Sequence, residues 1–445
     1  MTKYLAPFIL ILLISCKESK TPKTTYFGGK IINPKTNYIT LSDNYSFNDT
    51  IYLKKDNSFF TSLKNVKKGL YKFQHGPEHQ YVYLEPNDSL LLRLNTWAFD
   101  ESLVFSGKDA ERNNLLIEAF LQTEQDENDF SKFYKLNQQE FLKKIDSIKQ
   151  VKKQLINNYK NNTINISNEF IEILNIALLY PVYTNLEEYA ICNFRKEKPE
   201  KLVHSYFNYR NSINTRKDSL IFFSPYYSFI IDKLYNDVYL NKNRTDNFTV
   251  DLLNNINTSI TSEEIKNKLL YNSVVRHFFK EPNQKNKKES FFTFFKLNTN
   301  IEHKKNIQRL INDLKLLKEG QKLPSFDLVD ATGESKNILK IIKGKNTIIL
   351  FKDYQYASDE WIASRINHLI KNNPNIKFIV VNLGTTSKKY TKGIAIKYQY
   401  TAPKNSTIYK YSSSKFPRMI LIDKKGVIKN SYLSLSSKNN NFNLK

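Results

Sequence analysis

The chain has 445 residues, which is too long for one ordinary domain. Of these residues, 40% are hydrophobic and 13% aromatic, which is enough to build packed cores. The 68 Lys and Arg against 43 Asp and Glu give a formal net charge of +25, which by itself would suggest nucleic acid or an anionic surface as a partner. However, the basic residues are spread along the whole chain, and no nucleic-acid-binding motif accompanies them. We therefore expect two or three domains and no nucleic-acid partner.

The chain begins with the pattern of an exported protein. Lys3 supplies a positive charge, and Leu5 to Ile14 form an apolar run that is too short to span a bilayer. Leu13-Ile14-Ser15-Cys16 then matches the lipobox of bacterial lipoproteins. This resemblance implies a signal peptide over residues 1–15 and an acylated Cys16.

A lipid anchor has consequences for location. Two or three acyl chains on Cys16 would hold the protein stably on a membrane. Lys17, rather than Asp, after the cysteine favours the outer membrane over the inner. We expect a cell-envelope protein, on the periplasmic side or at the cell surface, in which residues 16–24 form a polar tether.

Residues 25–108 consist of short apolar stretches separated by turn signals. Asn33-Pro34, Asp56-Asn57, Gly76-Pro77 and Pro86-Asn87 supply the breaks. This pattern predicts a small antiparallel β-sandwich. The predicted strands are Tyr38 to Leu41, Thr50 to Leu53, Ser58 to Leu63, Leu70 to Phe73, Gln80 to Leu84 and Leu90 to Leu94.

One motif in this region has a recognisable form. Tyr83-Leu84-Glu85-Pro86-Asn87-Asp88-Ser89 is followed by Phe105-Ser106-Gly107 and by Asn113-Asn114. Together they resemble the β-rich domain that precedes thioredoxin-like domains in many lipoproteins of Gram-negative bacteria. The resemblance assigns no chemistry to this domain.

The interval between Gly107 and Gly320 contains no glycine, which predicts helices because glycine is costly inside them. Amphipathic runs fit an α-helical domain over residues 109–319. Two aromatic clusters, residues 222–227 and 291–295, either belong to a hydrophobic core or line a ligand groove, and the core is the more common outcome.

The cysteine count restricts redox chemistry. The chain has two cysteines, and an acylated Cys16 has no free thiol, so Cys192 is alone in the mature protein. Its neighbours predict a helix with apolar character. We therefore expect Cys192 to be buried and inert.

The last third of the chain is organised around residues 348–361. The apolar Ile348 to Phe351 predict a buried strand, and Ser358-Asp359-Glu360 open a helical pattern. With Leu323-Pro324-Ser325-Phe326 upstream and Phe416-Pro417 before a further strand, residues 320–435 resemble the thioredoxin-like domains of TlpA- and ResA-type thiol-disulfide reductases of the cell envelope, and we assign residues 320–445 to this domain. The resemblance implies a thioredoxin-like α/β fold.

The redox motif of that family is missing. The two positions of its Cys-x-x-Cys fall on Tyr356 and Asp359, and neither a phenol nor a carboxylate can carry out disulfide exchange. Asp359 instead places negative charge at a helix N-terminus, where it is stabilising. Pro417 occupies the position of the family's cis-proline, beside the groove where reductases hold a substrate peptide.

Other common catalytic constellations are absent from the sequence. His75 and His79 are separated by Gly76-Pro77 and cannot share a helical face, and no second pair has metal-ligand spacing. There is no nucleophile elbow and no phosphate-binding loop. We expect no catalytic residue, no metal and no cofactor.

The whole sequence thus predicts an α+β multidomain lipoprotein: a β-sandwich, an α-helical middle and a thioredoxin-like domain that lacks redox cysteines. The favoured function is binding or scaffolding of a protein or peptide partner. One alternative is a thiol-disulfide oxidoreductase of the TlpA and ResA type. Another is a lipoprotein that binds a peptide or glycan through the helical middle.

Overall fold

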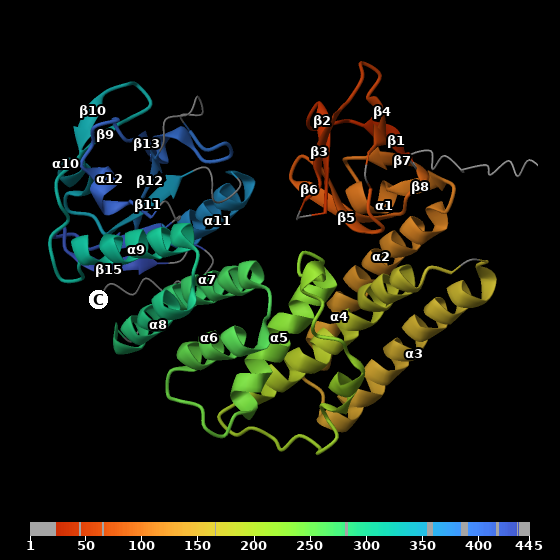
Figure 1. Cartoon of the computed structure of the whole chain (residues 1–445). Helices are drawn as coiled ribbons and strands as arrows, with labels where there is room; N and C mark the ends of the chain where they lie inside the picture. Colours follow the sequence, from red (N-terminus) through yellow and green to blue (C-terminus); the bar gives the residue numbers. More distant parts are fainter. Residues whose placement is uncertain are drawn as a thin grey trace, which may run out of the picture. The chain divides into compact units, whose positions relative to one another are not determined.

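The computed structural model describes residues 24–43, 46–64, 66–164, 166–280, 284–353, 359–383, 390–414, 418–433 and 435. The chain divides into two compact units, Met1–Asn236 (unit 1) and Asp237–Lys445 (unit 2), both mixed in α and β structure as predicted (Figure 1). The division falls inside helix α5 (Ser224–Leu240). No helix within the described ranges is both long enough and apolar enough to cross a bilayer.

Unit 1 begins with a β-sandwich of two four-stranded sheets, ordered β4-β1-β7-β8 and β3-β2-β5-β6. Alternate residues of each strand point between the sheets, where Phe27, Phe73 and Leu94 are fully buried. All six predicted strands are present, with ends that differ by at most two residues. The strands are β1 (Thr25–Ile32), β2 (Tyr38–Ser42), β3 (Asn48–Tyr52), β4 (Ser58–Leu63), β5 (Gly69–His75), β6 (Glu78–Leu84), β7 (Ser89–Asn95) and β8 (Val104–Gly107).

The sandwich is not antiparallel throughout, which corrects the prediction. β1 pairs with β4 in the antiparallel sense but with β7 in the parallel sense. The chain returns to this sheet at β7 after strands of the other sheet, so the connection is a crossover, and a crossover permits parallel pairing. Gly29 allows the close approach, since a Cβ there would lie 2.3 Å from the carbonyl oxygen of Leu92.

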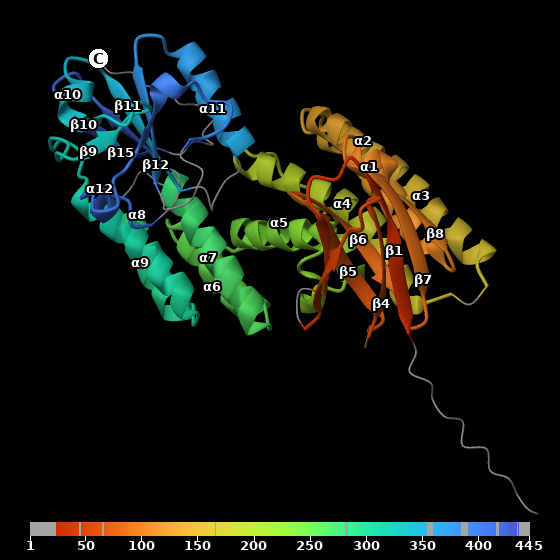
Figure 2. The same cartoon turned by 90° about the horizontal axis from the view of Figure 1, so that it is seen from above.

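Long helices complete unit 1. The central one, α4, packs against both α2 and α3, and these helices lie side by side in both views (Figures 1 and 2). α4 buries residues on all its faces, as a helix surrounded by protein should. The helices of this unit are α1 (Phe99–Ser102), α2 (Ala110–Phe133), α3 (Gln138–Asn162), α4 (Asn168–Phe194) and the short η1 (Asn208–Ser212) and η2 (Asp218–Leu220), followed by α5.

Unit 2 starts with four helices and continues into a seven-stranded sheet. The helices α6 (Phe248–Ser259), α7 (Glu263–Lys280) and α8 (Gln284–Leu297) pack against one another, and α9 (Ile301–Leu316) packs on α7. The predicted helical interval is therefore helical on both sides of the unit boundary.

The sheet of unit 2 has the order β10-β9-β13-β12-β11-β14-β15. β11 lies near its centre, parallel to β12 and antiparallel to β14, and α11 connects β11 to β12. This part of unit 2 is therefore a mixed α/β arrangement with an α-helix between two parallel strands. The elements are β9 (Asp327–Val329), β10 (Ser335–Asn337), α10 (Ile338–Ile342), β11 (Thr347–Asp353), α11 (Asp359–Asn372), β12 (Lys377–Leu383), η3 (Ile396–Tyr398), β13 (Gln399–Thr401), α12 (Ile408–Tyr411), β14 (Arg418–Ile422) and β15 (Ile428–Leu433).

Two hydrophobic cores cover the two faces of this sheet. Ile348 and Leu350 of β11 face α11, which buries Ile362 and Ile366 against them. Ile349 and Phe351, which alternate with them along the strand, face the opposite core with α10 and α12. The predicted buried strand followed by an amphipathic helix is thus confirmed.

Candidate functional site

The end of β11 carries a buried cation where the sequence predicts an apolar strand. Lys352 is only 3% exposed, on the α11 side of the sheet. A buried ammonium group is costly unless it is paired. Its Nζ atom forms an ion pair with the carboxylate of Asp359 and donates a hydrogen bond of 2.9 Å to Thr391 Oγ1.

Asp359, at the position of the second family cysteine, is the first residue of α11. One of its carboxylate oxygens binds Lys352, and the other accepts a hydrogen bond of 3.3 Å from the backbone N–H of Lys392. The expected placement of negative charge at a helix N-terminus is therefore observed, with a buried counterion that the sequence analysis did not foresee.

Thr391 extends this pair into a buried polar network. Its hydroxyl donates to Asn382 Oδ1 over 2.8 Å, at the end of β12. Its backbone N–H donates to Gln399 Oε1 over 2.7 Å, and the Gln399 amide donates back to the Thr391 carbonyl over 3.0 Å. The polar atoms at the carboxyl ends of β11 and β12 are thus committed to one another, as a structural network requires.

A second buried cation lies at the same end of the strands, on the opposite face of the sheet. Arg418 opens β14, pairs in register with Phe351 and is 0% exposed. Its guanidinium lies over the ring of Phe351, and Nη2 donates to the carbonyl oxygen of Tyr411. Burial lowers the pKa of Arg418.

Sequence reasoning missed both cations, although signals for them exist. Lys352 interrupts the apolar run that ends at Phe351, and Arg418 precedes the apolar Met419 to Ile422. A charged residue inside a buried strand indicates a partner. Of the predicted site residues, Asp359 is placed here, whereas Cys16, Tyr356 and Pro417 lie outside the described residues.

Cys192 corrects a prediction. It lies on α4 as expected, near the end of the helix, but its side chain is exposed. Partial desolvation and the carboxylate of Glu188 raise the pKa of this thiol. A raised pKa reduces the thiolate fraction, so the environment disfavours a nucleophilic role.

The histidines fit no metal site in the described ranges, where no group of three or more His, Cys, Asp or Glu side chains converges. His75 is buried and organises a turn: Nε2 accepts a hydrogen bond of 2.9 Å from the backbone N–H of Lys35, and Nδ1 lies 3.0 Å from the carbonyl oxygen of Tyr38. Burial lowers the pKa of His75.

The two aromatic clusters have different environments. In the first, Phe223 and Tyr226 are buried in the core of unit 1. In the second, Phe291 and Phe294 are buried, but Phe292 is 74% exposed. Phe292 borders a hollow of about 850 Å³ between α6 and α8. The other residues around it are Thr245, Asp246, Asn247, Val250, Lys285, Asn286, Lys288, Glu289 and Thr293.

The motif that begins at Tyr83 attaches the sandwich of unit 1 to α2. Asn113 makes both hydrogen bonds of the Tyr83 backbone: Oδ1 accepts from the N–H over 2.7 Å, and Nδ2 donates to the carbonyl over 3.0 Å. Asn114 does the same for Phe105, over 2.8 and 3.0 Å. Adjacent asparagines thereby satisfy two strands at the start of one helix, which accounts for their presence in the motif.

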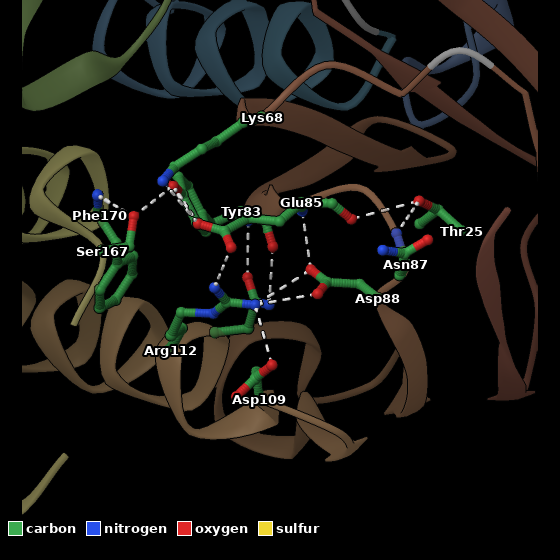
Figure 3. A network of polar contacts seen from close by, with 11 residues as sticks. Thr25, Lys68, Tyr83, Glu85, Asn87, Asp88, Asp109, Arg112, Ser167 and Phe170 are labelled. Atoms are coloured by element: carbon green, nitrogen blue, oxygen red, sulfur yellow. Dashed lines mark hydrogen bonds and ion pairs between the residues drawn. The ribbon is translucent and has the colours of Figure 1, made fainter. Parts of the chain in front are cut away.

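The acidic residues of the motif surround Arg112 of α2 (Figure 3). Arg112 forms ion pairs of 3.1 Å with both Glu85 and Asp88. Burial would raise the pKa of Glu85, but hydrogen bonds from Tyr83 and Ser167, with the charges of Lys68 and Arg112, lower it to about 2. Burial raises the pKa of Asp88, against the effect of Arg112. These contacts indicate a structural ion-pair network.

No family model and no curated protein matches this chain. Parts of it are similar to solved structures. A structure from Bacteroides vulgatus described as a thiol-disulfide oxidoreductase is 28% identical, over 28% of this chain and 93% of its own, with a TM-score of 0.25. The thioredoxin domain of a thiol-disulfide oxidoreductase from the same organism is 22% identical, over 25% of this chain and 86% of its own, with a TM-score of 0.21. A thiol peroxidase from Chromobacterium violaceum is 15% identical, over 25% of this chain and 74% of its own, with a TM-score of 0.20. With TM-scores this low, these similarities assign no activity to this chain.

Proposed function

We propose that this chain is an envelope lipoprotein whose thioredoxin-like part has no redox chemistry and works by binding or scaffolding a protein or peptide partner. The observation that carries the proposal is the ion pair of Lys352 and Asp359. The carboxylate at the position of a redox thiol is held by a buried cation, which is a structural use of that position.

The composition of unit 2 supports the same proposal. Residues 237–445 contain no cysteine, so this unit has no thiolate to attack a disulfide and none to resolve a mixed disulfide. A thiol-disulfide oxidoreductase, the alternative, would have to start from Cys192 in unit 1. That thiol has a raised pKa and no second thiol to complete the reaction.

A reductase assay tests this part of the proposal. The mature chain and a Cys192→Ser variant are compared for reduction of insulin with dithiothreitol as the electron source. Both should match the rate of dithiothreitol alone. Reduction that exceeds this background in the wild type and disappears in Cys192→Ser would establish the oxidoreductase instead.

The lipid anchor is a separate part of the proposal and rests on the lipobox that ends at Cys16. In cells fed a labelled fatty acid, the wild type should carry the label and sediment with membranes. Cys16→Ala should remain unlabelled, and Ser15→Gly, which keeps a small residue before the cysteine, should behave as the wild type. An unlabelled, soluble wild type would contradict the anchor.

The hollow beside Phe292 favours a second candidate, a peptide- or glycan-binding site in the helical middle. An exposed aromatic side chain at the rim of a partly polar hollow suits both ligand classes. Arrays of oligosaccharides and of short peptides can be probed with the wild type, with Phe292→Ala and with Phe60→Ala. Phe60 is a matched exposed aromatic residue of unit 1, 56% exposed. Binding that only Phe292→Ala loses would support this site, and binding unaffected by that change would exclude it.

A further inference from the structure

Arg418 leaves two nitrogen atoms of a buried guanidinium unused. Nη2 donates to the carbonyl oxygen of Tyr411. Across the described residues, nothing accepts a hydrogen bond from Nε or Nη1. Arginine stays protonated in proteins, so a full positive charge with free N–H donors is enclosed at the start of β14.

Asp313 of α9 is a carboxylate whose charge acts on Arg418, but its oxygen atoms accept hydrogen bonds from other groups. Oδ1 accepts from the N–H and the hydroxyl of Ser413, over 2.7 and 2.8 Å, and Oδ2 accepts from the N–H of Ser414 over 3.0 Å. Asp313 acts on Arg418 through its field and opposes the effect of burial on the pKa. It therefore fixes Ser413 and Ser414 to α9 without pairing the guanidinium.

Two aromatic rings lie against the guanidinium, and the segment that it binds carries serine residues. The rings of Phe351 and Tyr432 lie 5.5 and 5.0 Å from it. Ser412, next to Tyr411 in the chain, has a buried hydroxyl that makes no hydrogen bond with any described residue. Ser414 lies beside the phenol of Tyr432. The group thus offers several hydrogen-bond donors around one positive charge.

Such a group is suited to an anion. Burying an unpaired charge and unsatisfied donors is strongly unfavourable, whereas a bound anion would satisfy the charge and the donors together. We propose that Arg418, together with Ser412, which follows the Tyr411 that Arg418 binds, forms a binding site for one small anion in unit 2. Nε, Nη1 and the Ser412 hydroxyl donate to this anion, which is either a halide or a compact oxyanion. The site does not depend on the partner-binding role proposed above.

Calorimetric titration and thermal unfolding of the full mature chain test the proposal. The protein is first dialysed into a buffer with sodium gluconate, whose anion is too large for an enclosed site. Chloride, formate and phosphate are then added at constant ionic strength. The wild type should bind one anion per chain and gain thermal stability in a saturable way. Chloride alone would identify a halide site, and formate or phosphate an oxyanion site.

Three variants separate the site from general salt effects. Arg418→Met should abolish saturable binding. Arg276→Met removes an exposed positive charge of the same unit and should leave binding unchanged. Ser412→Ala, a mild change that tests the site if Arg418→Met does not fold, should weaken binding about fivefold to tenfold through one lost hydrogen bond. No saturable binding by the wild type, full binding by Arg418→Met or unchanged affinity in Ser412→Ala would overturn the proposal.

Discussion

Lys352 at the end of β11 and Asp359 at the start of α11 form an ion pair in which the lysine is almost completely buried. The two residues depend on each other. A buried ion pair is not in itself strongly stabilising, because both charges lose their hydration, but the loss of one partner leaves the other charge uncompensated. The pair therefore links β11 to α11, and a substitution that removes only one of the two charges should lower the stability of unit 2.

The first prediction concerns this pair. Asp359→Asn should destabilise unit 2 by roughly 3 to 5 kcal/mol, because the buried Lys352 loses its counterion. The double variant Lys352→Met with Asp359→Asn should recover most of that loss. Urea unfolding measures both, and Glu360→Gln, an exposed neighbour in the same helical turn, is the control and should change stability by no more than about 1 kcal/mol. A double variant less stable than Asp359→Asn would contradict the assigned dependence.

The second prediction concerns Asn113 and Tyr83. Asn113→Ala leaves the buried N–H and carbonyl of Tyr83 without partners, and each unsatisfied group costs about 1 to 3 kcal/mol. The free energy of unfolding of unit 1 should fall by roughly 2 to 6 kcal/mol. Asn128→Ala, on an exposed part of the same helix, should have an effect below about 0.5 kcal/mol. Equal effects of the two substitutions would remove the structural reason for the motif.

The third prediction is a pH dependence that originates at Glu85. Its pKa is lowered to about 2 in the folded chain, below the ordinary value near 4.5. The stabilisation is therefore fully present above about pH 4.5 and is lost as the pH falls through about 2. The raised pKa of Asp88 works in the opposite direction, so the comparison with a variant isolates Glu85.

Thermal unfolding between pH 2 and pH 6 measures this effect, with several pH values near the folded pKa of about 2 and near the ordinary pKa of 4.5. At pH 6 the wild type should be more stable than Glu85→Gln, by at most about 3 kcal/mol. The difference should shrink as the pH decreases. Glu118→Gln, an exposed residue of α2, should run parallel to the wild type. A constant difference between wild type and Glu85→Gln would show that the carboxylate charge is not the cause.

Much of the fold could be predicted because local patterns and burial agree. Turn signals and short apolar stretches defined six strands of the sandwich, and the helices α2 to α9 all lie in the interval between Gly107 and Gly320. The parallel pairing of β1 with β7 could not be predicted in this way. It depends on contacts between residues more than 60 positions apart, for which a single sequence carries no periodic signal.

The candidate site was predictable in part. The position of Asp359 follows from counting along the strand and the helix, and its charge at a helix start was expected. The pairing with Lys352 was missed because the predicted buried strand ended at Phe351, whereas β11 continues to Asp353 and buries Lys352. Cys192 was misjudged because helical periodicity does not say which neighbouring helices cover each face.

The last prediction restores the missing chemistry. Tyr356→Cys with Asp359→Cys places thiols at both positions of the family motif, but the change at residue 359 also removes the counterion of Lys352. We therefore expect the double variant to be destabilised and to show weak activity at most. The triple variant with Lys352→Met should recover stability, form an intramolecular disulfide and reduce insulin above the dithiothreitol background. Mass spectrometry after alkylation measures the disulfide, and Tyr356→Ser with Asp359→Ser and Lys352→Met is the control without thiols. A triple variant that is stable yet forms no disulfide would mean that the two positions are not close enough to serve as a redox pair, and the counting from Phe351 would then be wrong.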